Sequence, residues 1–387
     1  MIYLDNHATT PCDPEVLDAM LPWMTEHFGN PHSDSHRFGR QAADAIGQAL
    51  HIIAERLGAP EESVVITSGA TESVWLAIRG VCTHPRQKRR RIVSVATEHP
   101  AVLDVLHDLA QEGFEVTTLA VSSDGIVDMT ELEAVMGDDV ALVTAMWANN
   151  EMGAVSDMKS IAEFAHRCGA LVHSDATQAV GRILVDAREF DVDILSGSAH
   201  KFYGPKGIGF TVVGNGNRRV RLRPLISGGC QQRGRRGGTM NPAATIAMAK
   251  ALELATQTLG EQSERIANLR DHLWDRLHQQ IPGVQLNGPA LSPRVNQGGH
   301  RLPGNLNLTL PDVEGETWMA ATPTVAFSSG SACSSVDPAP SHVLSAMGLS
   351  ESEARRSVRF GVGRFNTQDE IDRAAEALLE SYGRLKP

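Results

Sequence analysis

The chain has 387 residues, a formal net charge of −11 at pH 7 and 42% hydrophobic residues. This length is sufficient for two domains with hydrophobic cores of their own. The negative charge disfavours general nucleic-acid binding, which usually requires a basic surface. No apolar run approaches the roughly 20 residues that span a bilayer, and residues 1–5 lack the pattern of a signal peptide. We therefore expect a cytoplasmic protein that contacts neither membranes nor nucleic acid directly.

The cysteines are odd in number, widely scattered and without paired close spacing. This distribution argues against a disulfide framework and against a zinc cluster, and we expect no metal. At least one cysteine is therefore a candidate for chemistry. The cysteines are Cys12, Cys82, Cys168, Cys230 and Cys333.

Short β-branched runs alternate with longer amphipathic segments between about residues 63 and 213. The predicted strands are 64–66, 92–95, 116–119, 141–145, 171–173 and 194–195, and the predicted helices include 101–110, 129–135 and 161–168. This alternation predicts an α/β fold with a mostly parallel sheet. Chemistry in such sheets gathers at the carboxyl ends of the strands.

Polar residues follow several of these predicted strands. Residues 67–73 form a small-residue turn that opens a helix, where free backbone N–H groups and the Thr71 hydroxyl are suited to a phosphate. His99, Asn150 and Asp175 follow later strands. Each alone has a structural explanation, such as a helix cap or a satisfied core histidine. Together they place a phosphate cradle, an imidazole, an amide and a carboxylate on one edge of one sheet.

Lys201 lies in the glycine-rich loop 196–209, between two apolar runs. Its small, hydroxylated neighbours would desolvate the amine and lower its proton affinity, as a Schiff-base lysine requires. The alternative is an ordinary surface lysine in a turn. The groups at the neighbouring strand ends favour the chemical interpretation, because they match the needs of pyridoxal phosphate. The matching groups are Lys201 for the aldehyde, Asp175 for the pyridine nitrogen, Thr71 with Ser198 and His200 for the phosphate, and His99 over the ring.

The pattern changes after residue 213. A long helical segment is predicted from about residue 242 to residue 280, followed by strand-like runs at 306–310, 325–327 and 358–360 and a closing helix near 368–382. These elements predict a smaller α+β domain. We therefore expect a large domain of residues 14–255 and a small domain of residues 1–13 and 256–387.

The predicted small domain contains two further candidates for chemistry. Cys333 lies in the run Phe-Ser-Ser-Gly-Ser-Ala-Cys-Ser-Ser at 327–335. Such small polar surroundings are typical of a solvent-reachable thiol rather than of a core residue, although an incidental exposed thiol is the alternative. Arg359 lies on a predicted strand, where its side chain would be able to grip a carboxylate with two hydrogen bonds.

These motifs resemble the NifS/IscS-type cysteine desulfurases. That family belongs to the class V aminotransferases, which are fold type I, aspartate-aminotransferase-like enzymes with a large α/β domain and a smaller domain. The resemblance extends from residues 3–11 to residues 363–365. Its most specific motifs are Gly-Ala-Thr-Glu at 69–72, Ala-His-Lys at 199–201 and Ser-Gly-Ser-Ala-Cys at 329–333, and the last resembles the family's long catalytic loop.

The resemblance implies a role for each motif residue. Lys201 would hold pyridoxal 5'-phosphate covalently, and His99 would stack on its ring. The other implied cofactor contacts are Asp175 for the ring nitrogen, Asn150 and Gln178 for the ring hydroxyl, and Ala70, Thr71, Ser198 and His200 for the phosphate. Thr239 would reach the phosphate held by the partner subunit, which implies a homodimer. Arg359, with Asn30 near it, would bind the substrate carboxylate.

The implied reaction converts L-cysteine to L-alanine. Lys201 or His99 would remove the α-proton, and Cys333 would take the sulfur as a persulfide for delivery to a protein acceptor, as in iron–sulfur cluster assembly. One alternative is another fold type I C–S or C–Se lyase or an aminotransferase, in which Cys333 is incidental. A second is a non-catalytic sulfur-relay or regulatory homologue. His7 departs from the family pattern, since a small residue is usual at its position.

Overall fold

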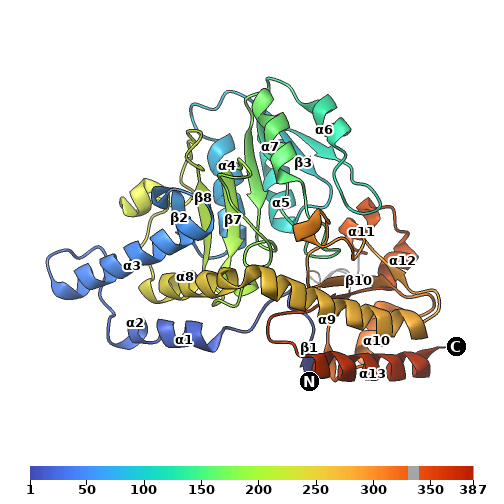
Figure 1. Ribbon diagram of the computed structural model, residues 1–387. Helices are drawn as coiled ribbons and strands as arrows, with labels where there is room; N and C mark the ends of the chain where they lie inside the picture. Colours follow the sequence, from blue (N-terminus) through green and yellow to red (C-terminus); the bar gives the residue numbers. More distant parts are fainter. Residues whose placement is uncertain (330–339, 387) are drawn as a thin grey trace.

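The two largest of the three β-sheets in the described residues have separate hydrophobic cores, and the seven-stranded sheet lies in the upper part of Figure 1. The structure is a computed structural model that describes residues 1–329 and 340–386. The large sheet has the strand order β2-β8-β7-β6-β5-β3-β4. Its strands are β2 (Val64–Thr67), β3 (Arg91–Val95), β4 (Glu115–Leu119), β5 (Val140–Thr144), β6 (Leu171–Asp175), β7 (Ile194–Ser198) and β8 (Gly209–Val213).

The large sheet is mostly parallel, as the sequence predicts. Strands β3 to β7 pair in parallel, whereas β8 pairs antiparallel with both β2 and β7. Its helices are α3 (Arg37–Arg56), α4 (Ala70–Cys82), α5 (Pro100–Gln111), α6 (Met129–Val135), α7 (Met158–Arg167) and α8 (Pro242–Gln257). The parallel arrangement brings the carboxyl ends of β3, β5, β6 and β7 to one edge.

Helices cover both faces of this sheet because successive strand residues point to opposite sides. Ile92 and Leu142 pack into the core formed with α4 and α5. Their neighbours Val93 and Val143 pack into the core that contains residues of α3, α7 and α8. All four side chains are inaccessible to solvent or nearly so. The near-continuous apolar strands are therefore those of a sheet buried on both faces.

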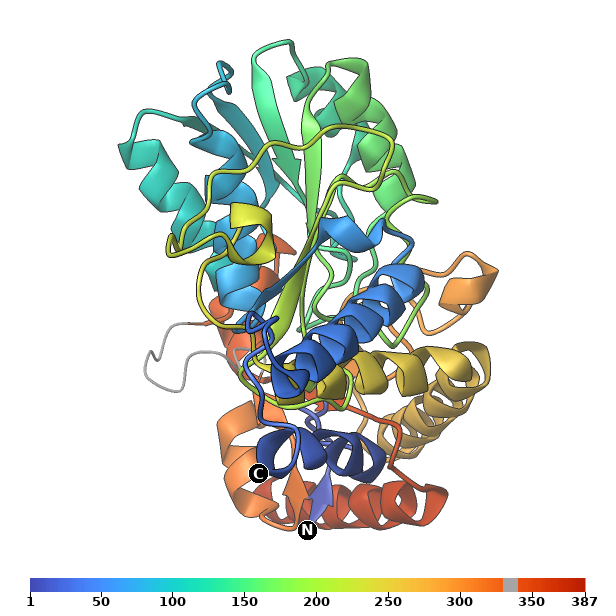
Figure 2. The same cartoon turned by 90° about the vertical axis from the view of Figure 1, so that its left-hand side faces the viewer.

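The second sheet is antiparallel and has the order β12-β13-β10-β9. Its strands are β9 (Gln285–Leu286), β10 (Asn305–Thr309), β12 (Ser328–Ser329) and β13 (Ser357–Gly361), and β1 (Ile2–Tyr3) pairs in parallel with β11 (Val325–Ala326) beside it. The accompanying helices are α9 (Leu259–Gln280), α10 (Gly315–Ala321), α11 (His342–Ala346), α12 (Glu351–Arg355) and α13 (Gln368–Leu385). Both chain ends lie in this lower part (Figures 1 and 2). Ile2 and Leu4 of the N-terminal segment belong to the core under this sheet; the domain limits stay a prediction.

The predicted long helical segment at 242–280 is divided in two. Thr258 has φ −123° and ψ 31°, values that interrupt the helical hydrogen bonding between α8 and α9. The two helices then serve different cores, since Ala247 of α8 packs under the large sheet and Leu273 of α9 under the small one. Two short helices, α1 (Pro14–Met20) and α2 (Pro22–Thr25), lead from the N-terminal segment to α3.

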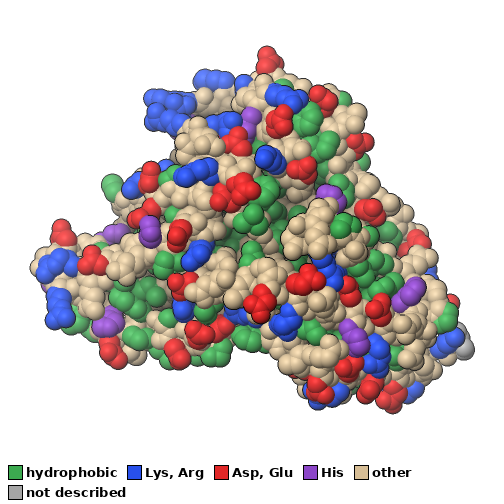
Figure 3. All heavy atoms as spheres, viewed as in Figure 1, with side chains coloured by type: hydrophobic (Ala, Val, Ile, Leu, Met, Phe, Trp, Pro, Cys, Tyr) green, Lys and Arg blue, Asp and Glu red, His purple; other side chains and the backbone are tan. Residues whose placement is uncertain are grey.

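The surface is unevenly charged. Figure 3 shows Lys and Arg side chains gathered at the upper left, in the region of the loops before β3 and after β8, where Arg86, Lys88, Arg219 and Arg221 are exposed. Within residues 1–329 and 340–386, no helix combines the length and apolarity needed to cross a membrane. Over the same residues no cluster of three or more His, Cys, Asp or Glu side chains is placed to hold a metal ion.

Candidate active site

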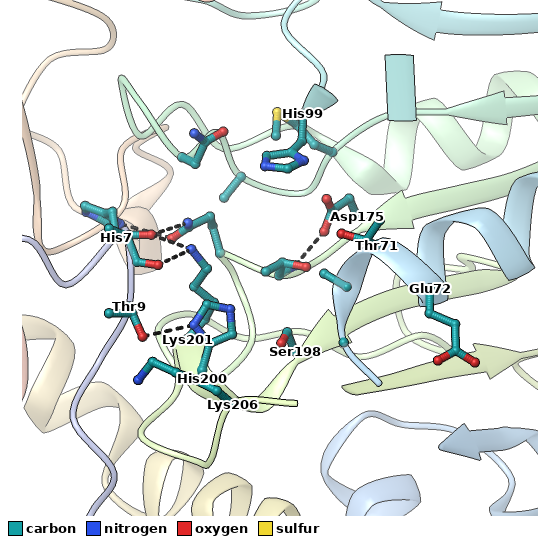
Figure 4. Close-up of a pocket in the computed structure, with 18 of the residues that line it drawn as sticks. His7, Thr9, Thr71, Glu72, His99, Asp175, Ser198, His200, Lys201 and Lys206 are labelled. Atoms are coloured by element: carbon teal, nitrogen blue, oxygen red, sulfur yellow. Dashed lines mark hydrogen bonds between the residues drawn. The ribbon is translucent and has the colours of Figure 1, made fainter. Parts of the chain in front are cut away.

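Residues that follow β2, β3, β5, β6 and β7 line one cavity of about 550 Å³ (Figure 4). His7 to Thr9 of the N-terminal segment and a side chain of β13 complete its wall. The structure therefore brings together most of the site residues predicted from the sequence. Those that line the cavity are Ala70, Thr71, His99, Asn150, Asp175, Gln178, Ser198, His200, Lys201 and Arg359.

Lys201 projects into this cavity from the connection between β7 and β8. A single 3-10 turn, Ala199–Lys201, follows β7 directly and places the lysine at the sheet edge. Its Nζ donates hydrogen bonds of 2.7 Å to the carbonyl oxygens of His7 and Ala8. The amine is thus partly buried and held by the N-terminal segment, which is not the setting of an ordinary surface lysine.

Asp175 ends β6 and is 5% exposed. Its Oδ1 accepts a 2.9 Å hydrogen bond from the Thr177 amide, which fixes the carboxylate at the cavity wall. The nearby Glu98 is fully buried, and burial together with the negative charge of Asp175 raises the pKa of Glu98 to about 8. Glu98 is therefore protonated at neutral pH, so only one of these two carboxyl groups needs to bear a negative charge.

His99 is the N-cap of α5, and its Nδ1 accepts a 3.1 Å hydrogen bond from the Ala101 amide. Because that amide can only donate, a neutral His99 carries its hydrogen on Nε2. Burial lowers the pKa of His99; the Asp175 carboxylate opposes this effect and the Lys201 ammonium adds to it. The ring is consequently a neutral, flat group that lines the cavity near Asp175 (Figure 4).

The phosphate cradle expected around Thr71 lies at the N-terminus of α4. The N-cap Gly69 has φ +151° and makes no side-chain capping bond, so the first N–H groups of α4 are open to an anion. A Cβ on Gly209 would lie 2.7 Å from the Gly69 Cα, so the start of β8 must be glycine for this close approach. Ser198 and His200 complete this end, and burial with the Lys201 charge lowers the pKa of His200 to about 4.

Arg359 of β13 also lines the cavity, with 1% of its surface exposed. Its Nη1 donates to the carbonyl oxygen of Asn150 at 2.8 Å, and its Nη2 donates to Asp5 Oδ1 at 2.9 Å and to Ser328 Oγ at 3.3 Å. Its Nε is buried without a hydrogen-bond partner among the described residues. A guanidinium with a buried, unused donor beside a cavity is suited to an anionic ligand.

Three predicted site residues are not part of this wall. Asn30 and Thr239 are exposed and do not line the cavity. The Asn30 side chain accepts a 3.0 Å hydrogen bond from the His32 amide. Cys333 lies outside the described residues. The predicted roles of these three residues therefore stay predictions.

Sequence reasoning missed four polar groups at or behind this wall. Thr9 Oγ1 lies 3.0 Å from His200 Nδ1, and Lys206 also lines the cavity. Arg182 donates a 2.7 Å hydrogen bond to Gln178, and Asp5 pairs with Arg359. Asp5 and Thr9 fall within residues 3–11, which resemble the family, whereas no helical spacing marks Arg182, because Gly181 between it and Gln178 has φ +74°.

Comparisons with known proteins agree with this geometry. The model of the family "Aminotransferase class-V" matches residues 2–374. Cysteine desulfurase IscS of Escherichia coli O139:H28 is 44% identical over 387 residues, covering all of this chain and 93% of that protein. The IscS of Rickettsia massiliae is 41% identical over 385 residues and is covered to 92%.

Solved structures give the same result. A NifS-like protein superposes with a TM-score of 0.89 at 32% identity, with 99% of both chains covered. SspA in complex with cysteine superposes with a TM-score of 0.81 at 32% identity, covering 95% of this chain and all of that one. The arrangement of the two sheets is therefore that of the NifS-like structures.

Proposed function

Because the chain belongs to the class-V aminotransferase family, we propose that it is a pyridoxal-phosphate-dependent cysteine desulfurase. It converts L-cysteine to L-alanine and passes the sulfur to Cys333 as a persulfide for a protein acceptor. The observation that carries the proposal is the single cavity that Lys201, Asp175, His99 and the open N-terminus of α4 share. Each supplies a group that this cofactor requires.

The donor set fits pyridoxal phosphate from end to end. The uncapped α4 N-terminus with Thr71 and Ser198 offers donors to the phosphate, and Asp175 offers a carboxylate to the ring nitrogen. Lys201 is the amine for the aldehyde, and the Gln178 amide is at hand for the ring hydroxyl. When bound, the cofactor supplies an electron sink for the electron pair that remains on the substrate Cα after the α-proton is removed.

Lys201 is the group that takes the α-proton. The Ala101 amide occupies His99 Nδ1, so the neutral His99 ring presents an N–H rather than a lone pair at Nε2. His99 therefore covers the ring, and the freed Lys201 amine accepts the proton at Nζ. Three of the five N–H donors of Arg359 are used within the described part of the chain, so two remain, one of them on Nε, to bind the α-carboxylate and orient Cα toward the lysine.

A borohydride experiment tests the lysine assignment. Reduction of the holoenzyme is expected to fix the cofactor on the peptide that contains Lys201, and Lys201→Ala is expected to abolish both this attachment and alanine formation from L-cysteine. Lys206→Ala is the matched control, because Lys206 lines the same cavity. Cofactor attachment to Lys206, or unchanged alanine formation by Lys201→Ala, would contradict the assignment.

The active form is a homodimer in this proposal, and Thr239 adds its hydroxyl to the phosphate held by the other subunit. Two observations support it: Thr239 is exposed and away from its own cavity, and large apolar side chains are exposed along α1 to α3. They are Leu17, Leu21, Met24, Phe28 and Phe38, between 45% and 69% exposed. Sedimentation equilibrium tests it, and a monomer at micromolar concentration would contradict it.

The proposal also places the enzyme in the cytoplasm. Cys12 and Cys230 are exposed free thiols, which suits a reducing compartment. The large-domain and small-domain limits at 14–255, 1–13 and 256–387 are part of the same proposal, supported by the separate cores under the two sheets.

A further inference from the structure

A guanidinium lies directly behind the cavity wall, where the chain leaves β6. The Val180 amide donates to the Ala176 carbonyl and the Ile183 amide to the Ala179 carbonyl, each at 3.0 Å, so the chain makes two overlapping turns, the second of which contains Gly181 at φ +74°. These turns bring Gln178 and Arg182 into contact, with Arg182 Nη1 2.7 Å from Gln178 Oε1. Gln178 faces the cavity, and Arg182 lies partly buried behind Gln178.

The partners of Arg182 are all neutral acceptors. Its Nη1 donates to Gln178 Oε1 at 2.7 Å and also to His7 Nδ1. Its Nη2 donates to the carbonyl oxygens of Asn6 at 2.5 Å and Lys201 at 3.1 Å. One side chain therefore joins the N-terminal segment, the turn after β6 and the backbone of the cofactor lysine.

These contacts decide which way the Gln178 amide points. A guanidinium has donors only, so the Gln178 atom that it contacts must be the carbonyl oxygen. The amide nitrogen Nε2 then faces the N-terminal segment and donates one hydrogen to the His7 carbonyl at 2.9 Å. Its second hydrogen remains for an acceptor in the cavity. With the amide reversed, an oxygen would face the carbonyl of His7.

His7 contacts both of these groups, because its Nδ1 lies 3.1 Å from Gln178 Oε1 and also contacts Arg182 Nη1. Because a guanidinium can only donate, the Nδ1 lone pair is assigned to the Arg182 contact, and Nη1 then serves two acceptors, Gln178 Oε1 and His7 Nδ1. Burial and then the Arg182 charge hold the pKa of His7 well below its ordinary value. The ring therefore stays neutral over the working pH range and continues to accept from Arg182. The His7 carbonyl oxygen accepts hydrogen bonds from Gln178 Nε2 and, at 2.7 Å, from Lys201 Nζ.

We propose that Arg182 and His7 are positioning residues that orient the Gln178 amide with its NH2 group toward the cofactor's ring hydroxyl. The inference rests on the proposed place of Gln178 at that hydroxyl. It assigns a role to His7, which departs from the family pattern, and to Arg182, which no motif marks.

A purely structural role for Arg182 predicts a different behaviour. If Arg182 only holds three segments together, it stabilises the fold whether or not Gln178 is present. The loss of cofactor affinity on replacing Arg182 would then add to the loss on replacing Gln178. As a positioning residue it acts through Gln178, so the two losses overlap. Non-additivity in a double-mutant cycle distinguishes the two roles.

The experiment measures the affinity of the full-length chain for pyridoxal phosphate, by titration after removal of the cofactor, and the visible absorption maximum of each holoenzyme. The variants are Gln178→Ala, Arg182→Met, the double variant and Arg182→Lys. The control is Arg265→Met. Arg265 is also partly buried and donates to backbone carbonyls, those of Arg364 and Asn366, without contacting Gln178. Melting temperatures are recorded for every variant.

We expect Gln178→Ala and Arg182→Met each to weaken cofactor affinity about tenfold, the effect of one good hydrogen bond, and the double variant to fall within about threefold of either. Both single variants shift the absorption maximum in the same direction, Arg182→Lys recovers part of the affinity, and Arg265→Met keeps it. Unchanged affinity in Gln178→Ala would overturn the proposed site for Gln178. Two outcomes would overturn the positioning role while leaving Gln178 at its proposed site, provided that Gln178→Ala loses affinity as expected. One is unchanged affinity in Arg182→Met, and the other is a hundredfold loss of affinity in the double variant. If Arg182→Met does not fold, Arg182→Lys in the Gln178→Ala background gives the same comparison.

Discussion

Replacing Arg359 with glutamine tests how the substrate carboxylate is bound. The change keeps a polar side chain but removes the charge and the two-pronged donor geometry. In the structure Arg359 is 1% exposed, held by Asn150, Asp5 and Ser328, and has its Nε unused among the described residues. Its side chain is thus positioned before the substrate arrives.

The magnitude follows from the hydrogen bonds that the carboxylate would lose. A hydrogen bond to a charged group contributes about 1.5–3 kcal/mol, so two such bonds contribute about 3–4 kcal/mol after partial replacement by glutamine. At about 1.4 kcal/mol per factor of ten, kcat/KM for L-cysteine is expected to fall about 100- to 1,000-fold. Arg359→Lys keeps the positive charge but loses the paired N–H donors of the guanidinium, and its kcat/KM for L-cysteine is expected to fall about tenfold.

The assay is the initial rate of alanine formation over a range of L-cysteine concentrations, with the cofactor absorbance recorded on the same samples. Arg356→Gln is the matched control, because Arg356 adjoins the same strand but donates to the Leu310 and Pro311 carbonyls instead of facing the cavity. A loss of less than threefold in Arg359→Gln with normal cofactor content would refute the assignment. An equal loss in Arg356→Gln would show that the effect is not specific to the site.

Further predictions concern stability and pH. Because burial and then the Asp175 charge raise the pKa of Glu98 from its ordinary value of 4.5 to about 8, the native state binds this proton more tightly than the unfolded state. This contribution is fully present below about pH 4.5 and is lost as the pH rises to about 8, at up to about 1.4 kcal/mol per pH unit; Glu98→Gln should flatten that part of the urea-unfolding profile, and an unchanged slope would contradict the burial argument. Gly361→Ala places a Cβ 2.8 Å from the amide nitrogens of Asn6 and His7, and should cost about 1–3 kcal/mol of unfolding free energy together with weaker cofactor retention. The comparison is Gly383→Ala in α13, where no atom lies within 4 Å and a gain of about 0.5–1 kcal/mol is expected; equal effects of the two alanines would contradict the steric explanation.

The large sheet and most of the cavity were predictable because both depend on local sequence. Buried strands read as apolar runs, and parallel pairing brings the residues that follow them to one edge. Asp175 is the last residue of β6, and Lys201 follows the end of β7 by three residues. Their convergence is therefore a consequence of sheet topology, which the alternation of elements already indicates.

The rest depends on contacts between distant segments. Asp5 reaches Arg359 and Asn6 reaches Arg182 only because the N-terminal segment crosses between the two sheets. No periodicity encodes such a crossing. The break at Thr258 was also missed, because Thr is an acceptable helix residue and the change of core on either side of it is a tertiary effect.

The central claim is that sulfur passes from L-cysteine to Cys333. A single turnover with sulfur-labelled L-cysteine and no acceptor, followed by alkylation and peptide mass analysis, measures this most directly. The account predicts up to one labelled sulfur per chain, on the peptide containing Cys333, with alanine formed in equal amount. In Cys333→Ser the cofactor absorbance should persist while label and turnover disappear. Undiminished multiple-turnover release of labelled sulfide by Cys333→Ser would contradict the account.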